Sequence, residues 1–295
     1  MRNLNISRFL VTGGAGFIGS HIVEELLKRG MQVRVLDNFE TGKRENLRFP
    51  NLHKDMLDHS LELIEGDIRD LDVCRVACDR VDYVFHQAAL TSVPKSVNYP
   101  SVTNEVNVSG TLNILLAAKE KGIKRVVYAS SSSIYGKSDC LPLQEDQKPS
   151  PISPYAVSKL AGEYYCSVFS KIYGLETISL RYFNVFGPRQ DPKSKYAAVI
   201  PKFIQAALKE EPLEIHGDGL QTRDFTYVSN VVEANILATK VPHTSGEVVN
   251  IACGKRYSIV DLVNGISEIL GKELRTHHIE QRTADVRHSL ADISL

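Results

Sequence analysis

Residues 9–19 decide the fold class of this chain, and they read Phe9-Leu-Val-Thr-Gly-Gly-Ala-Gly-Phe-Ile-Gly19. An apolar run passes here through a glycine turn into the start of an amphipathic helix. Glycine lets the backbone come close to a pyrophosphate, and the free N–H groups at a helix start offer donors and the positive end of the helix dipole. The turn therefore predicts a dinucleotide site, with these candidate contacts: Gly13, Gly16, Phe17, Ile18 and Gly19.

A carboxylate after the next predicted strand strengthens this interpretation, because a glycine turn by itself can serve packing alone. The strand Gln32–Leu36 ends at Asp37, at the distance where an acidic side chain meets the adenosine ribose hydroxyls. A carboxylate there repels a 2′-phosphate, so the sequence favours NAD over NADP. Asn38 adjoins this site. Asp67 and Ile68 follow the third predicted strand and are candidate adenine contacts, although an Asp at this place can equally belong to a turn.

Beyond this motif, short β-branched runs alternate with longer segments of helical period as far as residue 180. The alternation predicts the α/β class, with a Rossmann-type doubly wound parallel sheet that helices cover on both faces. We expect residues 1–180 to form an NAD-binding core, to which segments near 226–252 return, and residues 181–295 to form mainly a smaller C-terminal substrate-binding lobe. The predicted strands are Phe9–Thr12, Gln32–Leu36, Leu61–Glu65, Tyr83–His86, Arg125–Ala129 and Thr177–Arg181.

One predicted helix bears directly on the chemistry. Ser153 is its candidate N-cap, Pro154 suits its first position, and Gly174 supplies a stop after Ala156–Tyr173. After Arg181 the pattern becomes irregular. The sequence there predicts turns at Phe186–Gln190 and His216–Gly219 and helices near Ala198–Lys209, Ser229–Thr239 and Ser258–Leu270.

The composition limits the kinds of partner. Of 295 residues, 43% are hydrophobic and 24% are charged, as in a soluble globular protein. Lys plus Arg and Asp plus Glu number 35 each, so no basic excess would attract nucleic acid or an anionic membrane. The five cysteines lack CxxC pairs, which predicts reduced thiols and neither a disulfide framework nor a metal site. Because Met1–Arg8 is polar and no apolar run approaches about 18 residues, we expect a soluble, cytoplasmic protein.

A second motif, Tyr155-Ala-Val-Ser-Lys159, begins the capped helix. The i, i+4 spacing places the phenol and the ammonium on one helical face, where Lys159 can stabilise a phenolate. Lowering a tyrosine pKa from about 10 toward neutrality needs roughly 4 kcal/mol, which we expect the ammonium and a positive nicotinamide ring to supply together. The same spacing also occurs by chance on surface helices.

The serine-rich run Ala129–Gly136 supports a catalytic role for that motif. It follows a predicted strand whose carboxyl end should lie above the same cleft. A serine hydroxyl there can hold a sugar hydroxyl between itself and Tyr155. The alternative is that the run forms a plain polar loop.

Three further segments extend the pattern: His86-Gln-Ala-Ala89, Leu180-Arg-Tyr-Phe-Asn-Val-Phe-Gly-Pro-Arg189 and residues 219–227. Together with the earlier motifs they make the chain resemble the extended short-chain dehydrogenase/reductase family, specifically the UDP-hexose and UDP-N-acetylhexosamine 4-epimerases. The likeness spans nearly the whole chain. It implies an NAD-dependent isomerase that acts on a UDP-sugar, and a homodimer formed by the helix after Tyr155 and the helix near Val102–Lys121.

The resemblance implies a role for each residue of the catalytic motif. Ser131 resembles the catalytic serine, Tyr155 the base and Lys159 the residue that binds the nicotinamide ribose. In the family's mechanism the base removes the O4 proton while the C4 hydride passes to NAD⁺, and the 4-keto sugar turns over before hydride returns to its other face. The net redox change is zero, so the cofactor stays bound. Further cofactor contacts are implied for Gln87, Ala88, Ala89, Asn107 and Tyr182.

Substrate contacts are implied in the same way. Arg223 and Arg282 match positions that bind the diphosphate, and Asp285 lies near the uridine ribose. Asn184 matches a contact with the phosphates, and Val199 joins the same site. Either arginine taken alone is equally explained as an ordinary surface charge.

Substrate choice depends on Ser289, which aligns with a large tyrosine in enzymes restricted to UDP-glucose and UDP-galactose. A small side chain leaves room for an N-acetyl group at C2, and Ser132 and Ser133 can hydrogen-bond that group. We therefore expect UDP-N-acetylglucosamine and UDP-N-acetylgalactosamine as substrates, alongside the plain UDP-hexoses. The alternative is a UDP-glucose 4-epimerase only.

Other activities are disfavoured by their chemistry. The 4,6-dehydratases of the family carry an Asp-Glu pair where this chain has Ser132 and Ser133, and the decarboxylating relatives need a glutamate nearby. The Tyr–Lys pair counts against a non-catalytic dinucleotide-binding protein, and the two arginines count against a net oxidoreductase that exchanges its cofactor. Family members usually continue past the position equivalent to Leu295 in a closing helix, so we expect either that the chain is truncated here or that its lobe is minimal.

Overall fold

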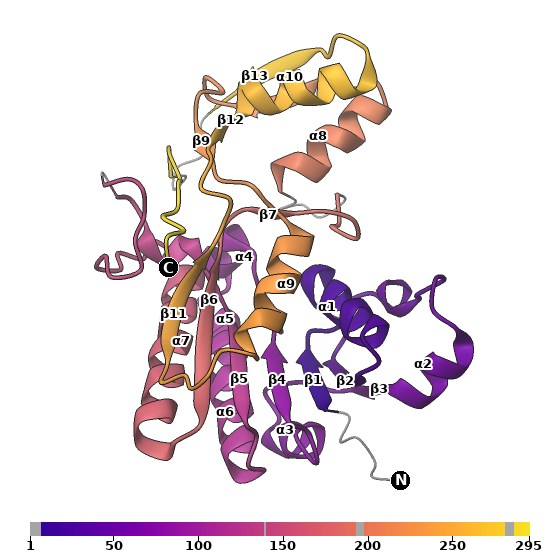
Figure 1. The fold of residues 1–295 in the computed structure, drawn as a ribbon. Coiled ribbons are helices and arrows are strands. Elements are labelled where there is room, and N and C mark those ends of the chain that lie inside the picture. Colours follow the sequence, from indigo (N-terminus) through magenta and orange to yellow (C-terminus); the bar gives the residue numbers. More distant parts are fainter. Residues whose placement is uncertain (1–6, 139, 193–197, 281–285) are drawn as a thin grey trace.

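The centre of the molecule is a seven-stranded sheet with the order β11-β6-β5-β4-β1-β2-β3 (Figure 1). The computed structural model describes residues 7–138, 140–192, 198–280 and 286–295. Each neighbouring pair of strands in this sheet is parallel. The strands are β1 Arg8–Thr12, β2 Gln32–Asp37, β3 Leu61–Glu65, β4 Tyr83–His86, β5 Arg125–Ser131, β6 Glu176–Tyr182 and β11 Glu247–Ile251.

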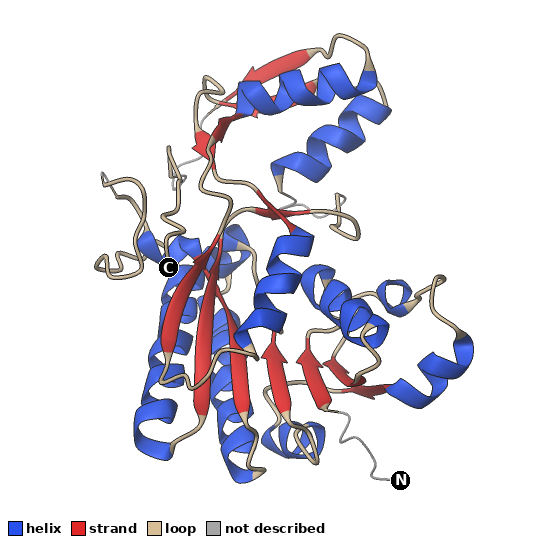
Figure 2. Cartoon of the chain, in the orientation of Figure 1, coloured by secondary structure: helices blue, strands red, loops and turns tan. Residues whose placement is uncertain are grey.

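Alternation of side chains along β1 builds a core on each face of the sheet. Phe9 and Val11 pack on one side with α1 and α9, whereas Leu10 packs on the other side with α3, α6 and α7. Figure 2 shows these helices on both sides of the sheet. They are α1 Phe17–Lys28, α3 Leu71–Ala77, α6 Gly110–Glu120, α7 Pro154–Tyr173 and α9 Val228–Ala238. The predicted α/β class and the doubly wound Rossmann-type sheet are confirmed.

The helix that carries Tyr155 begins and ends where its capping residues predict. Ser153 Oγ accepts a hydrogen bond from the N–H of Ala156 at 3.1 Å, and Pro154 occupies the first helical position. Gly174 ends the helix in the left-handed conformation, with φ 70°. These caps fix where α7 begins and ends, and therefore the direction of its side chains at Tyr155 and Lys159.

The single helix predicted near Val102–Lys121 is interrupted. The chain forms α5 (Pro100–Asn104), then a π-helical turn, η2 (Glu105–Ser109), before α6 begins. Asn107 lies in that turn, and its amide exchanges two hydrogen bonds with the backbone of Leu90. A π turn of this kind widens a helix locally and is frequent at functional sites.

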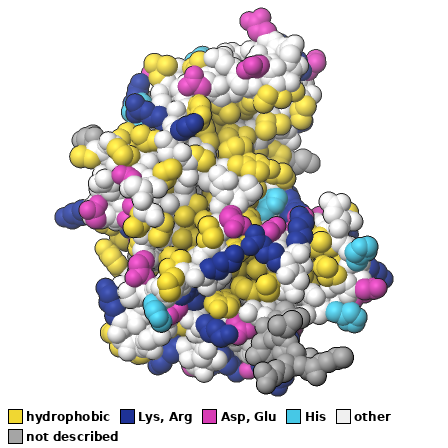
Figure 3. All heavy atoms as spheres, in the orientation of Figure 1, with side chains coloured by type: hydrophobic (Ala, Val, Ile, Leu, Met, Phe, Trp, Pro, Cys, Tyr) yellow, Lys and Arg dark blue, Asp and Glu magenta, His cyan; other side chains and the backbone are white. Residues whose placement is uncertain are grey.

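Residues after β6 build most of an upper lobe above the carboxyl ends of the sheet strands (Figure 1). Two helices, α8 Val199–Leu208 and α10 Ile259–Leu270, pack against the parallel pair β8 (Leu213–His216) and β13 (Thr276–Ile279) through an apolar core. Figure 3 shows hydrophobic side chains gathered over this lobe. Short strands connect it to the sheet, namely β7 Val185–Phe186, β9 Thr222–Arg223, β10 Thr226–Tyr227 and β12 Tyr257–Ser258.

Smaller helices complete the described part of the chain: η1 Arg44–Leu47, α2 Lys54–Ser60, α4 Val93–Asn98 and η3 Ser132–Tyr135. Within the described ranges, no helix combines the length and the apolar character that crossing a membrane requires.

Candidate active site

The glycine turn between β1 and α1 leaves no space for side chains at two of its positions. Gly13 has φ 66°, and a Cβ on it would lie 2.8 Å from the backbone of Ala88. A Cβ on Gly19 would lie 2.2 Å from the carbonyl oxygen of Gly13. Gly16 is the N-cap of α1 and offers no capping side chain, so the first N–H groups of the helix, at Phe17 and Ile18, lack a side-chain acceptor. Such a cradle fits a diphosphate.

Asp37, at the end of β2, ties this turn to the next loop. Its buried carboxylate accepts hydrogen bonds from the N–H groups of Ala15 at 2.9 Å and Phe39 at 2.8 Å. Burial raises the pKa of this carboxyl group, and the two backbone hydrogen bonds oppose that shift. Each carboxylate oxygen can still accept another bond, as a ribose hydroxyl would require.

Asp67, Asn38 and Ile68 lie together beyond the ends of β2 and β3. Asn38 Nδ2 donates to Asp67 Oδ2 at 2.8 Å, and the Arg69 guanidinium beside Asp67 lowers the pKa of that carboxyl to about 2. Ile68 is buried. Asn38, expected beside the ribose site, and Asp67, expected at the adenine, are thus hydrogen-bonded neighbours.

Gln87, in the segment after β4, joins a polar cluster with the buried residues Tyr182 and Asn235. Gln87 Nε2 donates to Tyr182 OH and to Asn235 Oδ1, both at 3.1 Å. Ala88 N–H donates to the hydroxyl of Thr12 at 3.2 Å, and Ala89 follows, half-buried. Two of the predicted cofactor residues, Gln87 and Tyr182, are therefore in direct contact.

Tyr155, Lys159 and Ser131 meet at the carboxyl end of β5. Tyr155 is 8% exposed and Lys159 3% exposed, on successive turns of α7. The side chain of Ser131 lies close enough to Tyr155 to lower the pKa of its phenol. Lys159 Nζ donates to the carbonyl oxygen of Ala129 at 2.8 Å, which fixes the ammonium under the end of the strand.

Burial dominates the protonation of these groups. It raises the pKa of Tyr155, and the Ser131 side chain only partly opposes the increase. Burial also lowers the pKa of Lys159 to about 8. The expectation that Lys159 and a positive nicotinamide ring together lower the tyrosine pKa concerns the NAD-bound protein and stays a prediction. In the chain alone, desolvation of the phenolate dominates. The chain by itself therefore holds Tyr155 as a neutral phenol.

A pocket of about 660 Å³ opens between the upper lobe and the short strands below it. Its lining brings together three of the predicted substrate residues, Asn184, Val199 and Arg223. Arg223 Nη1 donates to the carbonyl oxygens of Thr222 at 2.9 Å and Arg287 at 3.2 Å, which orients the guanidinium. The walls combine apolar side chains with the cations Lys202 and Arg223, and Glu211 and Glu214 also line the pocket.

The serines assigned to the sugar lie in two segments. Ser289 is 8% exposed, and its N–H donates to the carbonyl oxygen of Thr222, beside Arg223, at 3.1 Å. Ser132 is half-buried, and the buried Ser133 Oγ has no hydrogen-bond partner in the described part of the chain. Arg282 and Asp285 lie outside the described residues.

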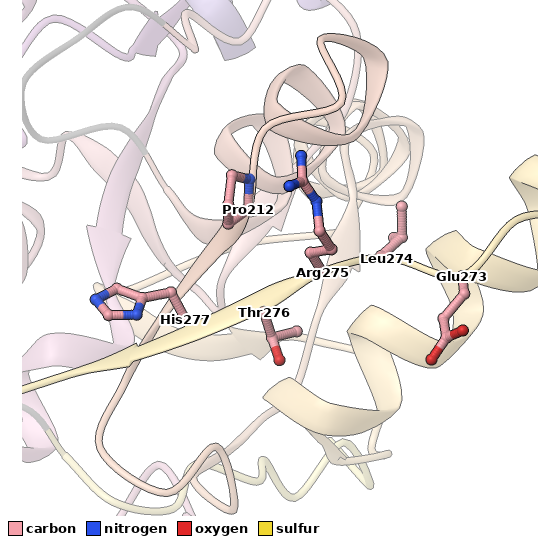
Figure 4. Close-up of a pocket in the computed structure, with 6 residues that line it drawn as sticks. All are labelled: Pro212, Glu273, Leu274, Arg275, Thr276 and His277. Atoms are coloured by element: carbon pink, nitrogen blue, oxygen red, sulfur yellow. The ribbon is translucent and has the colours of Figure 1, made fainter.

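A second hollow lies elsewhere on the lobe, at the start of β13 (Figure 4). It is lined by Pro212, Glu273, Leu274, Arg275, Thr276 and His277. None of these lining residues belongs to the predicted site, so we assign it no role in the chemistry.

Comparison with known proteins gives this arrangement a family. Residues 9–252 match the model of the NAD dependent epimerase/dehydratase family. The chain belongs to this family. The resemblance stated from the sequence is therefore confirmed, and so is the prediction of NAD as the cofactor, which the glycine cradle and Asp37 fit.

Individual members of the epimerase/dehydratase family are similar over almost their whole length. A putative UDP-glucose 4-epimerase from Methanocaldococcus jannaschii is 40% identical over 96% of this chain and 89% of that protein. The solved UDP-N-acetylglucosamine 4-epimerase of Methanobrevibacter ruminantium M1, in complex with UDP-N-acetylmuramic acid, is 44% identical with a TM-score of 0.92, covering 98% and 90% of the two chains. A UDP-glucose 4-epimerase from Thermotoga maritima, solved with UDP-glucose, is 37% identical with a TM-score of 0.90, covering 97% and 90%.

Two charged residues near the candidate catalytic groups were not predicted from the sequence. Glu163 and Arg181 form a buried ion pair beside Ser130, the residue before Ser131. The signal for Glu163 was present, because the spacing of Tyr155 and Lys159 continues to it by one more helical turn. The signal for Arg181 was a charge inside an otherwise buried strand, where an unpaired cation would be costly.

Proposed function

We propose that the chain is an NAD-dependent UDP-hexose 4-epimerase, with UDP-N-acetylglucosamine and UDP-N-acetylgalactosamine as its preferred pair and the plain UDP-hexoses as a second pair. One observation carries the proposal: the buried Tyr155 shares a helical face with Lys159, whose ammonium is bonded to Ala129 near the carboxyl end of β5, two residues before Ser131. This is the arrangement that proton removal from a sugar hydroxyl requires.

In this proposal, Ser131 and Tyr155 hold the sugar O4 hydroxyl between them. NAD, when bound, supplies the acceptor for the C4 hydride and the source from which that hydride returns. Tyr155 Oη takes the O4 proton as the C4–H bond breaks and gives it back when the bond re-forms on the opposite face of the sugar. Lys159, held by Ala129, provides the positive charge that supports the phenolate while it carries no proton.

The cofactor contacts follow the positions described above. We assign the diphosphate to the start of α1, the adenosine ribose to Asp37 and the nicotinamide end to Tyr155 and Lys159. The complete proposed set is Gly13, Gly16, Phe17, Ile18, Gly19, Asp37, Asn38, Asp67, Ile68, Gln87, Ala88, Ala89, Asn107, Tyr155, Lys159 and Tyr182. In this assignment residues 1–180 form most of the NAD-binding core, and residues 181–295 form mainly the substrate-binding lobe.

On the substrate side, the pocket of about 660 Å³ supports an anchored nucleotide. We assign the diphosphate to Arg223, Asn184 and Arg282, and the uridine to the pocket near Val199 and Asp285. An anchored nucleotide lets the sugar alone turn over between the two hydride transfers, so the intermediate does not leave.

The preference for N-acetylated sugars rests on the serines. Ser289 is small and buried near Arg223, and Ser133 Oγ is a buried hydroxyl that lacks a partner in the described chain. A polar group of this kind gains a hydrogen bond from an acetamide. The likeness to the UDP-N-acetylglucosamine 4-epimerase of Methanobrevibacter ruminantium M1 supports the same choice.

We also propose a homodimer through α7 and the α5–α6 region. Val157, Tyr164, Val168 and Ile172 are exposed on α7 at helical spacing, so they form one apolar stripe. Sedimentation of the purified protein is expected to give a dimer, and Tyr164→Glu is expected to give monomers; a monomeric wild type would contradict this proposal.

The function is tested by incubating the purified protein separately with UDP-N-acetylglucosamine, UDP-glucose and UDP-glucuronate and resolving the products by NMR. Inversion at C4 of the first two, with stoichiometric NAD retained after desalting, is the expected result. Oxidised or decarboxylated products, or loss of NAD during each turnover, would instead favour a net oxidoreductase of the same superfamily.

A further inference from the structure

Glu163 continues the catalytic face of α7. Tyr155, Lys159 and Glu163 follow one another at i, i+4 and i+8, and all three are buried. The Glu163 and Arg181 side chains are 3% and 4% exposed. Arg181 donates from Nε to Glu163 Oε1 and from Nη2 to Oε2, both at 2.9 Å. A two-pronged pair of this kind fixes orientation as well as distance.

The same ion pair is hydrogen-bonded to β5, the strand that carries Ser131. Ser130 Oγ donates to Glu163 Oε1, and Ser130 stands directly opposite Arg181 in the β5–β6 pairing. One carboxylate on α7 therefore holds the residue immediately before Ser131, while α7 itself carries Tyr155. Because Ser131 and Tyr155 have to hold one hydroxyl between them, the offset between β5 and α7 sets their geometry.

The network also reaches the segment that carries Ser289. Arg181 Nη1 donates to Tyr135 OH at 2.8 Å, and Tyr135 OH donates to Asn250 Oδ1 at 2.7 Å. Asn250 stands opposite Arg181 in the β6–β11 pairing, and its Nδ2 donates to the carbonyl oxygen of Asp292 at 3.2 Å. A continuous set of hydrogen bonds thus joins the catalytic helix to the C-terminal segment, and buried networks of this kind define one arrangement of their members.

We propose that the Glu163–Arg181 ion pair is the positioning element that holds Ser131 and Tyr155 in register for proton transfer. The inference rests on the proposed epimerase function. Neither residue is assigned a contact with the sugar or with NAD; they act through Ser130 and through the placement of α7 against the sheet. Burial lowers the pKa of Lys159, and the negative charge of Glu163 opposes that shift and so supports the protonated form of the lysine.

A purely stabilising role is the competing explanation, and the chemistry of buried ion pairs separates the two. Removing one partner leaves an uncompensated buried charge, whereas replacing both partners by apolar side chains of similar size is often neutral or stabilising. We therefore expect the double variant Glu163→Leu/Arg181→Met to keep the fold while it removes the hydrogen bond between Ser130 and Glu163.

The double variant is compared with the wild type in its NAD content, its affinity for UDP, its thermal midpoint, kcat and KM. We expect retained NAD, unchanged UDP affinity and KM, and kcat lowered by about 10²-fold, as small misplacements of catalytic groups produce. A stable double variant with wild-type kcat would overturn the positioning role.

Glu176→Gln is the matched control. Arg125 and Glu176 form another ion pair between β5 and β6, at the opposite ends of the same strands. This variant should keep wild-type kcat, which would show that the effect belongs to the carboxyl end of the sheet. An equal loss of kcat would overturn the proposal.

If the double variant fails to fold, the variant Ser130→Ala tests the proposal, because it removes only one hydroxyl. We expect a lower kcat at unchanged KM and thermal midpoint. An unchanged kcat would reject the proposal.

A further measurement needs no turnover. Phenolate absorbance is titrated in the NAD-loaded protein, and the curve of Tyr155→Phe in the same background is subtracted, which cancels Tyr128 and Tyr135. Burial raises the pKa of Tyr155 and the Ser131 side chain opposes that rise, so the double variant should titrate at higher pH; an unchanged titration would count against positioning. If the wild type inverts none of the three nucleotide sugars, the proposed epimerase function is rejected. A shift of the Tyr155 titration in the double variant would still support the positioning role.

Discussion

The catalytic face of α7 and the pocket below the upper lobe hold their polar groups in different ways. On α7, Tyr155 and Lys159 are buried, and Lys159 donates a hydrogen bond to Ala129 in β5. In the pocket, Arg223 and Asn184 are half-buried, and backbone carbonyl oxygens orient their side chains. The first region is a buried polar network, and the second is a pocket whose lining mixes apolar, cationic and acidic side chains.

This difference indicates which step of the proposed reaction each region serves. Proton transfer requires fixed distances and low dielectric, which a buried network provides. Binding a charged nucleotide and letting its sugar turn requires attraction with less complete enclosure. Substitutions on α7 should therefore change kcat, and substitutions in the pocket should change KM; each prediction below tests that division.

Tyr155→Phe should have the largest effect. Removing the hydroxyl abolishes the acceptor of the O4 proton, so we expect kcat to fall by about 10²–10⁴-fold. UDP-sugar affinity, measured by calorimetry, should remain close to that of the wild type because the nucleotide contacts lie in the upper lobe. Turnover near the wild-type rate would exclude Tyr155 as the base.

Arg223→Met should give the opposite pattern. The loss of a charged hydrogen-bond donor is expected to raise KM and the UDP dissociation constant by about 10- to 100-fold, with little change in kcat. Arg256→Met provides the control, because this exposed arginine lies beside β12, the partner of β9, and is not in the pocket lining. A drop in kcat at constant KM would contradict the division between the two regions.

Ser289→Tyr should act on one class of substrate. The added ring fills the space proposed for the N-acetyl group, so activity on UDP-N-acetylglucosamine should fall by about tenfold or more while activity on UDP-glucose persists. Because Ser289 is buried, the larger side chain also costs about 1–3 kcal/mol of stability, which the thermal midpoint reports. Ser289→Ala should preserve both activities. An equal loss on both substrates would mean that Ser289 does not select the sugar.

The same two regions differ in how far the sequence predicts them. Six strands of the core and the caps of α7 are local features, and the structure reproduces them to within a residue or two, whereas the seventh strand, β11, was not predicted. The upper lobe is only partly local: its helices follow from periodicity, but β8 and β13 pair residues as distant as Leu213 and Thr276. Their sequences, LEIH and THHI, carry too few apolar residues to indicate a strand pair.

Within the site, residue identity was easier to predict than electrostatic state. The motif places Tyr155 and Lys159 on one face, as the structure has them. The degree of burial, which raises the tyrosine pKa, depends on packing between β5, α7 and the loops and has no local signature. The Glu163–Arg181 ion pair could not be predicted for the same reason, because the two side chains meet only when α7 packs against β6.

The smallest expected effect is a pH dependence that belongs to Lys159. Burial lowers the pKa of this lysine to about 8, so the ammonium is present below that pH and is lost as the pH rises through it. We expect kcat/KM, which reports the enzyme before substrate binds, to fall on the alkaline side near this value. His86 does not contribute there, because burial lowers the pKa of its imidazole to about 3.

Lys159→Arg identifies the group responsible for that alkaline limb. A guanidinium stays charged throughout this pH range, so the limb should move to higher pH even if a poorer fit lowers the maximal rate. An alkaline limb that stays at the wild-type position would assign it to another group. The charge on Lys159 would then not be what supports the Tyr155 phenolate, and the burial of this lysine would serve packing alone.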